Sequence, residues 1–189
     1  MMPTDVKALK QDLTRRMEGA METLKKEFSG LRTGRASPAL LEPVRVDAYG
    51  SISPLNQVAN ISVAGPGLLA VQVWDKGLTK AVESAIREAN LGLNPQAEGQ
   101  VIRVPLPPLT TERRNDLAKT AARYAEHARV AVRGVRRDGM EQIKAAGKKS
   151  ELGEDEVKRA EDDVQKLTDQ FVKQIDAALV EKDKDIRTV

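Results

Sequence analysis

Three long stretches of this chain place apolar residues three or four positions apart, which is the spacing of one face of an α-helix. In the first, residues 4–31, the successive intervals are 3, 4, 4, 3, 4, 4 and 3 residues. The apolar positions are Val6, Leu9, Leu13, Met17, Ala20, Leu24, Phe28 and Leu31. Pro3 and Thr4 are expected at the helix entry and N-cap, and Gly34 is the predicted stop. The spacing thus predicts a first helix of roughly 40 Å, at 1.5 Å per residue.

The other two stretches predict two more long helices. One runs over about residues 110–149, with Thr110 or Thr111 as its N-cap. Three glycines weaken it by about 1 kcal/mol each relative to alanine, but no proline interrupts it. They are Gly134, Gly139 and Gly147. The last stretch has apolar positions over residues 157–179 and begins with acidic residues 154–156, which the helix dipole favours.

Helices with one apolar stripe each bury those stripes against one another. The short connection at residues 147–153 favours antiparallel packing within one chain. We therefore expect an elongated antiparallel three-helix bundle. A coiled-coil homo-oligomer is the weaker alternative.

Residues 35–104, between the first two helices, show short strand signals separated by turn residues. The predicted strands are residues 44–46, 61–63, 69–74 and 101–104, with a turn at 65–67 and a short helix at 79–90. The predicted fold class is α+β with two domains. Residues 1–33 and 107–189 form the helical bundle, and residues 34–106 form a small inserted α/β domain, layered like a β/α/β sandwich.

Two connections join the predicted domains, at residues 32–38 and 104–109. Gly34 loosens the first, whereas Pro105, Pro107 and Pro108 stiffen the second. Two parallel links restrict twisting more than one would, so the sequence predicts a hinge with limited directions of motion. A rigid two-domain protein is the alternative.

Composition removes several classes of function. The chain has no cysteine and one histidine, which excludes disulfides and Cys-ligated zinc and disfavours a His-based metal site or a serine-type triad. No apolar run reaches the roughly 18 residues of a membrane helix, and the N-terminus lacks a signal-peptide pattern. We expect a soluble cytoplasmic protein that works by binding, with no cofactor and no metal.

The net charge of +3 conceals an uneven distribution. Residues 1–34 carry 7 basic and 5 acidic side chains, and residues 35–104 carry 6 of each. Residues 105–149 carry 11 basic and 5 acidic, a net charge of +6, whereas residues 150–189 carry 7 and 12, a net charge of −5. The second predicted helix is therefore the basic element, and the third is its acidic counterpart.

Four arginines of that basic helix share one face. At 100° per residue, Arg129, Arg133, Arg136 and Arg137 fall within a 100° sector away from the apolar stripe. Guanidinium groups suit bidentate phosphate contacts, and like charges this close cost stability without a partner. The alternatives are a solvated face or salt bridges to the acidic third helix.

This arginine sector suits a partner rich in phosphate groups better than recognition of nucleic-acid bases. Stacking on single-stranded bases needs exposed aromatic side chains, and Phe28, Tyr124 and Phe171 belong to the predicted bundle stripes. Tyr49 and Trp74 alone make a poor platform. We therefore expect contact with the backbone or shape of folded RNA, although DNA also satisfies this argument.

Several motifs resemble those of the ribosome recycling factor family, in order and essentially end to end. They are residues 32–38 (RTGRASP), 90–95 (NLGLNP), 102–110 (IRVPLPPLT), 128–138 (ARVAVRGVRRD) and 162–168 (DDVQKLT). The resemblance implies an L-shaped molecule, similar to a tRNA in outline, that acts after peptide release. With elongation factor G and GTP hydrolysis on that partner, it would split the post-termination ribosome while lying on the large subunit across the A and P sites.

The resemblance also implies roles for individual residues. Arg133 and Arg136 match the family's critical basic-helix arginines, and Arg32 and Arg35 match its basic residues near ribosomal RNA. Gly34 and the three prolines match its hinge. A monomer is expected. The competing interpretations are a helical-bundle protein-interaction scaffold that docks through the acidic helix and, less favoured, an RNA-modifying enzyme.

Overall fold

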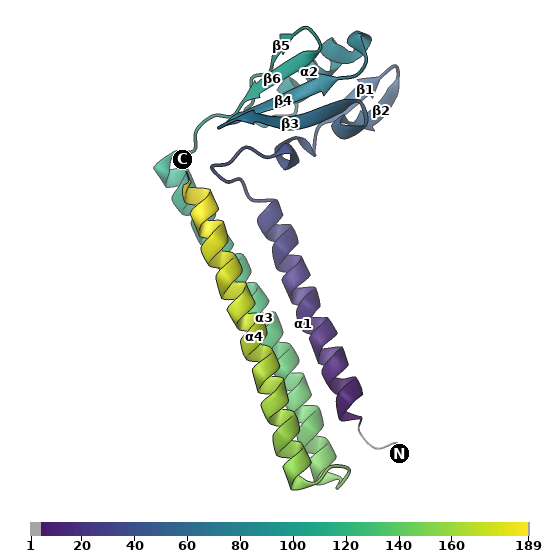
Figure 1. Ribbon diagram of the computed structural model, residues 1–189, viewed down its shortest axis with the longest axis vertical. Coiled ribbons are helices and arrows are strands. Elements are labelled where there is room, and N and C mark those ends of the chain that lie inside the picture. Colours follow the sequence, from purple (N-terminus) through teal and green to yellow (C-terminus); the bar gives the residue numbers. More distant parts are fainter. Residues whose placement is uncertain (1–4, 189) are drawn as a thin grey trace. The chain divides into compact units, whose positions relative to one another are not determined.

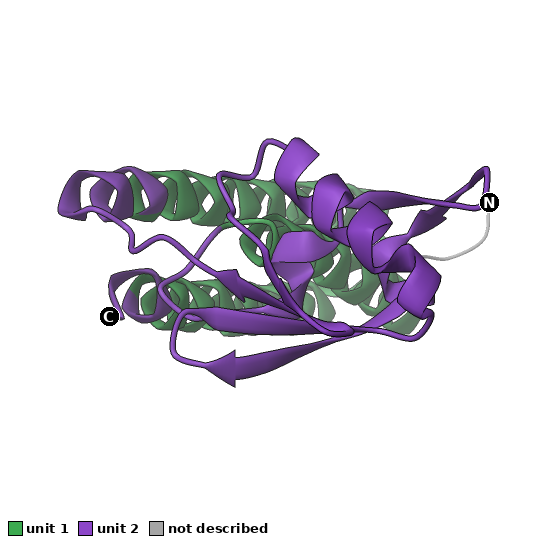
Figure 2. Ribbon diagram, turned by 90° about the horizontal axis from the view of Figure 1, so that it is seen from above, with its two compact units in different colours: residues 1–31, 118–183 green, residues 32–117, 184–189 purple. Residues whose placement is uncertain are grey.

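The computed structural model describes residues 5–188 (Figure 1). The chain divides into two compact units, each built from separate segments (Figure 2). Unit 1 holds residues 1–31 and 118–183, and unit 2 holds residues 32–117 and 184–189. The long helices α3 (Thr111–Lys148) and α4 (Glu154–Arg187) therefore contribute to both. Helices and small antiparallel sheets together confirm the predicted two-domain α+β class.

Unit 1 consists of helix α1 (Val6–Ser29) packed with α3 from residue 118 onward and with α4 up to residue 183. The predicted stripe of α1 is its buried face: Leu9, Leu13, Met17, Met21, Leu24 and Phe28. Side-chain contacts join α1 to both other helices. Lys10 bonds Asp163 near the start of α4, and Arg16 bonds Asp138 in the second half of α3. Helix α1 runs antiparallel to α3 and parallel to α4 (Figure 1).

The ends of α1 differ from the prediction. Pro3 and Thr4 lie outside the described residues, and the N-cap is Asp5, whose side chain accepts a hydrogen bond from the Ala8 amide. The predicted stop at Gly34 is wrong. The helix ends at Ser29 with Gly30 as its C-cap, because the Gly30 amide still bonds the Lys26 carbonyl.

Helix α3 is continuous, as predicted, and the Thr110 hydroxyl caps it by accepting from the Arg113 amide at 3.0 Å. One of its glycines has a packing role that periodicity does not reveal. A Cβ added at Gly139 would lie 2.5 Å from a methyl carbon of the fully buried Leu13. Of the three glycines of α3, Gly139 is the one at which α3 packs closely against α1.

Unit 2 contains a four-stranded antiparallel sheet in the order β3-β4-β6-β5, a β1-β2 hairpin and helix α2 (Figure 1). The strands are β1 (Arg45–Ala48), β2 (Ser51–Pro54), β3 (Ala59–Gly65), β4 (Leu68–Val73), β5 (Gln96–Glu98) and β6 (Val101–Pro105), and α2 spans Thr79–Glu88. Short 3-10 turns occupy Pro38–Leu41, Leu55–Gln57 and Lys76–Leu78. Helix α2 packs on β1 and on β6, so it lies between the hairpin and the larger sheet.

All four predicted strands, the short helix and the turn at residues 65–67 are present. Strands β2 and β5 were not predicted, because they are short and lack an apolar alternation. The β1-β2 turn also lacks the usual Asn-Gly or Asp-Gly signature, since Tyr49 supplies the first positive φ, at 53°. The core of unit 2 collects the inward side chains of both sheets around Val82 and Ile86 of α2.

Candidate nucleic-acid interface

The four predicted arginines of α3 all lie in unit 1, but they have different partners. Arg129 is the most enclosed, with 18% of its side chain exposed. Its guanidinium lies 2.7 Å from Asp176 on α4 and 3.0 Å from Glu126. Burial alone would lower the pKa of Arg129, yet these two carboxylates outweigh it and raise that pKa. Arg129 is therefore a permanently charged link between α3 and α4.

Arg136 also reaches α4, through a neutral side chain. Its Nε donates to the Gln165 side-chain oxygen at 2.7 Å, and Gln165 in turn donates to Asp169 at 2.9 Å. These two hydrogen bonds hold the Arg136 guanidinium beside α4. Asp169 accepts from Gln165 and not from Arg136, so the positive charge of Arg136 is not neutralised by direct contact. Arg136 thus keeps a cation at the edge of the α3-α4 seam.

Arg133 and Arg137 face outward. Arg133 is 56% exposed, and its nearest carboxylate is Glu126, at 3.6 Å. Arg137 is exposed and makes no hydrogen bond or ion pair within residues 5–188. The predicted sector therefore separates into two arginines held against α4 and two available to a partner.

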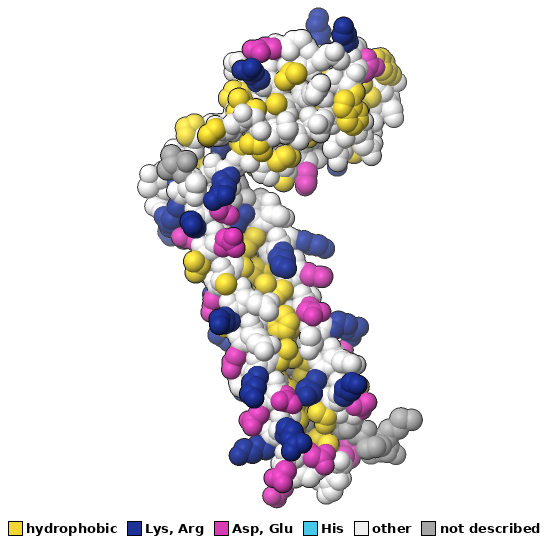
Figure 3. Space-filling model, viewed as in Figure 1, with side chains coloured by type: hydrophobic (Ala, Val, Ile, Leu, Met, Phe, Trp, Pro, Cys, Tyr) yellow, Lys and Arg dark blue, Asp and Glu magenta, His cyan; other side chains and the backbone are white. Residues whose placement is uncertain are grey.

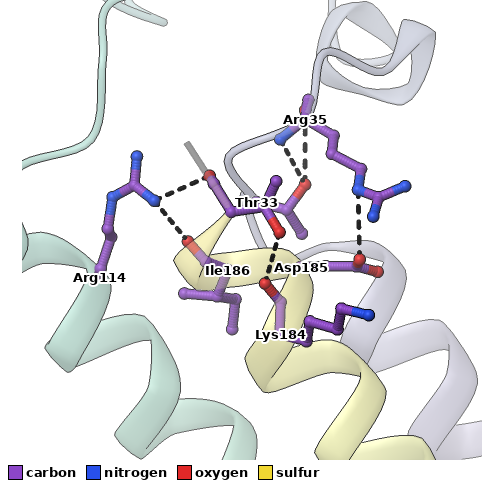
Figure 4. A network of polar contacts seen from close by, with 7 residues as sticks. Thr33, Arg35, Arg114, Lys184, Asp185 and Ile186 are labelled. Atoms are coloured by element: carbon purple, nitrogen blue, oxygen red, sulfur yellow. Dashed lines mark hydrogen bonds and ion pairs between the residues drawn. The ribbon is translucent and has the colours of Figure 1, made fainter.

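A second arginine cluster lies in unit 2, where segment 32–35 meets the start of α3 and the end of α4 (Figure 4). Arg35 contacts Asp185 at 3.3 Å and remains 63% exposed. Arg32 donates through Nη2 to the Pro107 carbonyl at 2.8 Å. Burial first, and then the positive charge of Arg114, lower the pKa of Arg32.

Arg114 is the member of this cluster that sequence reasoning missed. Its Nε donates to the Leu109 carbonyl, and its Nη1 donates to the carbonyls of Ile186 and Thr188 at 3.3 and 2.8 Å. The guanidinium thereby satisfies carbonyls at the end of α4, where a cation also suits the helix dipole. No local pattern points to this role, because Ile186 and Thr188 lie more than seventy positions away in the chain.

The predicted hinge residues belong to the same region of unit 2. The Gly34 amide donates to the Asp185 carbonyl at 3.1 Å, and a Cβ at Gly34 would collide with the Thr188 carbonyl. Its φ is not in the left-handed region, so glycine is required here for space. Pro105 ends β6, and Pro107 supplies the acceptor for Arg32.

The aromatic side chains are placed as predicted. Phe28 and Phe171 are buried and Tyr124 is half-buried, whereas Tyr49 and Trp74 are exposed. His127 lies exposed on α3. On the face shown in Figure 3, basic and acidic side chains alternate along the helices without forming a patch of one sign.

Within residues 5–188, no group of three or more His, Asp or Glu side chains is arranged to hold a metal ion. None of the helices in this described part is both long and apolar enough to cross a membrane.

Comparisons with known proteins agree with one another. The family model described as "Ribosome recycling factor" matches residues 24–186. The ribosome-recycling factor of Granulibacter bethesdensis is 69% identical over 188 residues, and that of Acidiphilium cryptum is 63% identical, each match covering 100% of both chains.

Solved structures give the same answer. A solution structure of the ribosome recycling factor matches with 42% identity and a TM-score of 0.76, covering 100% of both chains. A second match, with 42% identity and a TM-score of 0.67, covers 98% of this chain and 100% of the other. It comes from models of Thermus thermophilus ribosome recycling factor and Escherichia coli elongation factor G bound to the E. coli post-termination complex. The chain belongs to the ribosome recycling factor family.

Proposed function

We propose that this protein recycles ribosomes: it binds the post-termination ribosome across the A and P sites of the large subunit and, with elongation factor G and its GTP hydrolysis, splits the particle into subunits. Family membership over most of the chain is the observation that carries this proposal. A related chain, described together with elongation factor G on a post-termination complex, supports the choice of partners. The protein would act in the cytoplasm as a monomer and without catalysis of its own.

Contact with ribosomal RNA would begin at the outward arginines. Arg133 and Arg137 present guanidinium groups that can form charge-assisted, bidentate bonds to phosphate oxygens. Arg129 and Arg136 would set the position of α3 on α4 and add to the local positive potential. Arg32 and Arg35 would supply further cations from unit 2. Phosphate contacts of this kind recognise the shape of folded RNA without reading its bases.

The splitting step would use movement of the inserted domain, residues 34–106, on the helical residues 1–33 and 107–189. Gly34, Pro105, Pro107 and Pro108 lie in the two links that would form the hinge. Bonds from segment 32–35 to Asp185 would hold the first link to the end of α4, and the bond from Arg32 to the Pro107 carbonyl would join the two links. A cross-link between the moving domain and the helices should therefore preserve ribosome binding and abolish splitting.

The alternative is a scaffold that docks through the acidic helix α4. Three of the acidic side chains on α4 are already used within unit 1, since Asp163 bonds Lys10 at 2.8 Å, Asp176 bonds Arg129 and Asp169 accepts from Gln165. This internal use favours the RNA-binding proposal, because a docking face needs its charges available.

Binding to purified large subunits across a salt series tests the proposal. Each phosphate contact is expected to add about 0.7–0.9 to the slope of log affinity against log salt. Arg137→Gln should lower that slope and weaken binding about tenfold, whereas Lys25→Gln, on the exposed face of α1, should change neither. A flat salt response of the natural protein, or failure to split post-termination ribosomes in the presence of elongation factor G and GTP, would contradict the proposed function.

A further inference from the structure

A cavity of about 530 Å³ lies within unit 2, beside the segment that starts at Arg32. The residues that line it include Arg32, Arg35 and Arg114, together with Gly67, Pro108 and Thr188. None of the described residues that line it is aspartate or glutamate. Three guanidinium-bearing residues therefore border one hollow without a carboxylate in its wall.

Arg32 is the least compensated of these cations. A guanidinium has five N–H donors, and in residues 5–188 only the Nη2 group of Arg32 has a recorded acceptor, the Pro107 carbonyl. Its Nε is buried and makes no hydrogen bond in the described structure. A buried donor without an acceptor costs free energy, and a neighbouring like charge adds to that cost. The lowered pKa of Arg32 has these same two causes, burial and Arg114.

The other two guanidinium groups keep N–H donors free. Arg114 uses Nε and Nη1 for backbone carbonyls, which leaves Nη2 without a recorded acceptor. Arg35 contacts Asp185 through Nε, which leaves both terminal nitrogens. All of the recorded acceptors of Arg32 and Arg114 are neutral carbonyls, so the two positive charges are hydrogen-bonded without being neutralised.

We infer that this cavity binds a phosphoryl group, either free inorganic phosphate or a backbone phosphate of RNA. Phosphate oxygens match the planar fork of arginine and can bridge two guanidinium groups at once. Burial keeps water from the Nε of Arg32, which strengthens the attraction of this donor for an anion. The volume is that of a small-molecule site, so the cavity has room for the ester substituents of a phosphodiester as well.

This inference deepens the proposed function where the phosphate belongs to RNA, but the site exists in the free chain. A bound phosphoryl group would join segment 32–35 to the first turn of α3 through Arg32 and Arg114. Binding of inorganic phosphate therefore requires neither a ribosome nor elongation factor G.

The full chain, titrated with inorganic phosphate at an ionic strength held constant with chloride, tests the site by calorimetry and by NMR of the arginine Nε–H groups. We expect saturable 1:1 binding and a shift of the Arg32 Nε–H signal. Arg32→Gln should weaken binding at least tenfold. Arg113→Gln, which removes the same charge next to Arg114 but outside the cavity, should stay within twofold of the natural protein. Absence of saturable binding, or equal loss in both variants, overturns the inference.

A second pair of variants keeps the arginines intact. Ala36 lines the cavity, so Ala36→Glu places a carboxylate where the phosphoryl group would bind and should abolish phosphate binding. Ala36→Gln has nearly the same shape and should bind phosphate normally. Normal binding by Ala36→Glu overturns the inference even if Arg32→Gln does not fold.

The two sources of phosphate are separated by competition. A short RNA hairpin that displaces inorganic phosphate from the natural protein identifies the RNA backbone as the source. A hairpin that binds without displacing phosphate identifies the free anion, and both results support the site. Failure of the natural protein to bind large subunits counts against the proposed function alone, whereas failure to bind phosphate counts against this cavity alone.

Discussion

The arginines of α3 in unit 1 and those around residue 32 in unit 2 carry the same charge, but their partners differ. Arg129 meets two carboxylates and its charge is neutralised locally. Arg32 and Arg114 meet backbone carbonyls, which accept their hydrogen bonds and leave their charges intact. Two close carboxylates make Arg129 a structural link, whereas neutral carbonyls place Arg32 and Arg114 and keep their charges available to an anion.

A substitution at Gly34 should have the largest effect. The arginine cluster around residue 32 depends on segment 32–35 lying against the end of α4. Gly34→Ala would drive a Cβ into the Thr188 carbonyl and should destabilise unit 2 by about 2–3 kcal/mol. Urea unfolding followed by Trp74 fluorescence reports on unit 2, since Trp74 is the only tryptophan. Gly19→Ala, at a helical position with open space, should instead stabilise α1 by about 0.5–1 kcal/mol.

Arg114 tests whether carbonyl partners confer stability. Arg114→Met keeps the length of the side chain but removes three recorded hydrogen bonds, so we expect a loss of about 2 kcal/mol and faster amide exchange in the last turn of α4. Arg113→Met should leave exchange at that end unchanged. Equal effects from the two variants would show that the carbonyl contacts contribute nothing specific.

Arg129 and Arg137 test the carboxylate side of the comparison. Arg129→Met should destabilise the helical unit by about 1 kcal/mol, because it leaves Asp176 without its partner on α3. Arg137→Met should leave stability unchanged and weaken binding to large subunits about tenfold. Thermal unfolding by circular dichroism and a binding titration provide the two readouts. The reverse pattern would exchange the structural and RNA-contacting roles.

The smallest expected effect concerns Asp75, an exposed carboxylate whose partner is the neutral hydroxyl of Tyr49. The Tyr49 hydroxyl donates to Asp75 at 2.7 Å, and this bond, followed by one from the Gly77 amide, lowers the pKa of Asp75. Tyr49→Phe should raise that pKa towards its ordinary value, as measured by carbon NMR titration. A lowered pKa in the folded state contributes stability above the unfolded value, near pH 4, which is lost as the pH falls through the folded value. The variant should therefore lose less stability on acidification than the natural protein.

Much of the fold was accessible from periodicity alone. The stripe of α1, the uninterrupted α3 and the acidic start of α4 were all predicted, because side chains three and four positions apart share a helix face whatever else surrounds them. The four strands with apolar alternation were found for the equivalent reason. Strands β2 and β5 were missed because their pairing, and not their composition, makes them strands.

The candidate site was predictable as a set of residue types but not as a set of roles. The sector at Arg129, Arg133, Arg136 and Arg137 follows from 100° per residue. The separation into inward and outward arginines depends on Asp176 and Gln165, which lie 47 and 29 positions further along the chain. Gly34 was assigned to end a helix, whereas the structure uses it to admit the Thr188 carbonyl.

The sequence by itself determined the three helical stripes, the inserted strand-rich segment, the concentration of positive charge on one helix and the family motifs. These are properties of neighbouring residues, and local geometry is enough to reveal them. Only the tertiary structure decided which arginines are neutralised, why residue 34 must be a glycine and which carbonyls accept the hydrogen bonds of Arg114. Each of those depends on a carboxylate or carbonyl brought in from a distant part of the chain, and hydrogen bonding acts over a few ångströms of space regardless of separation in sequence.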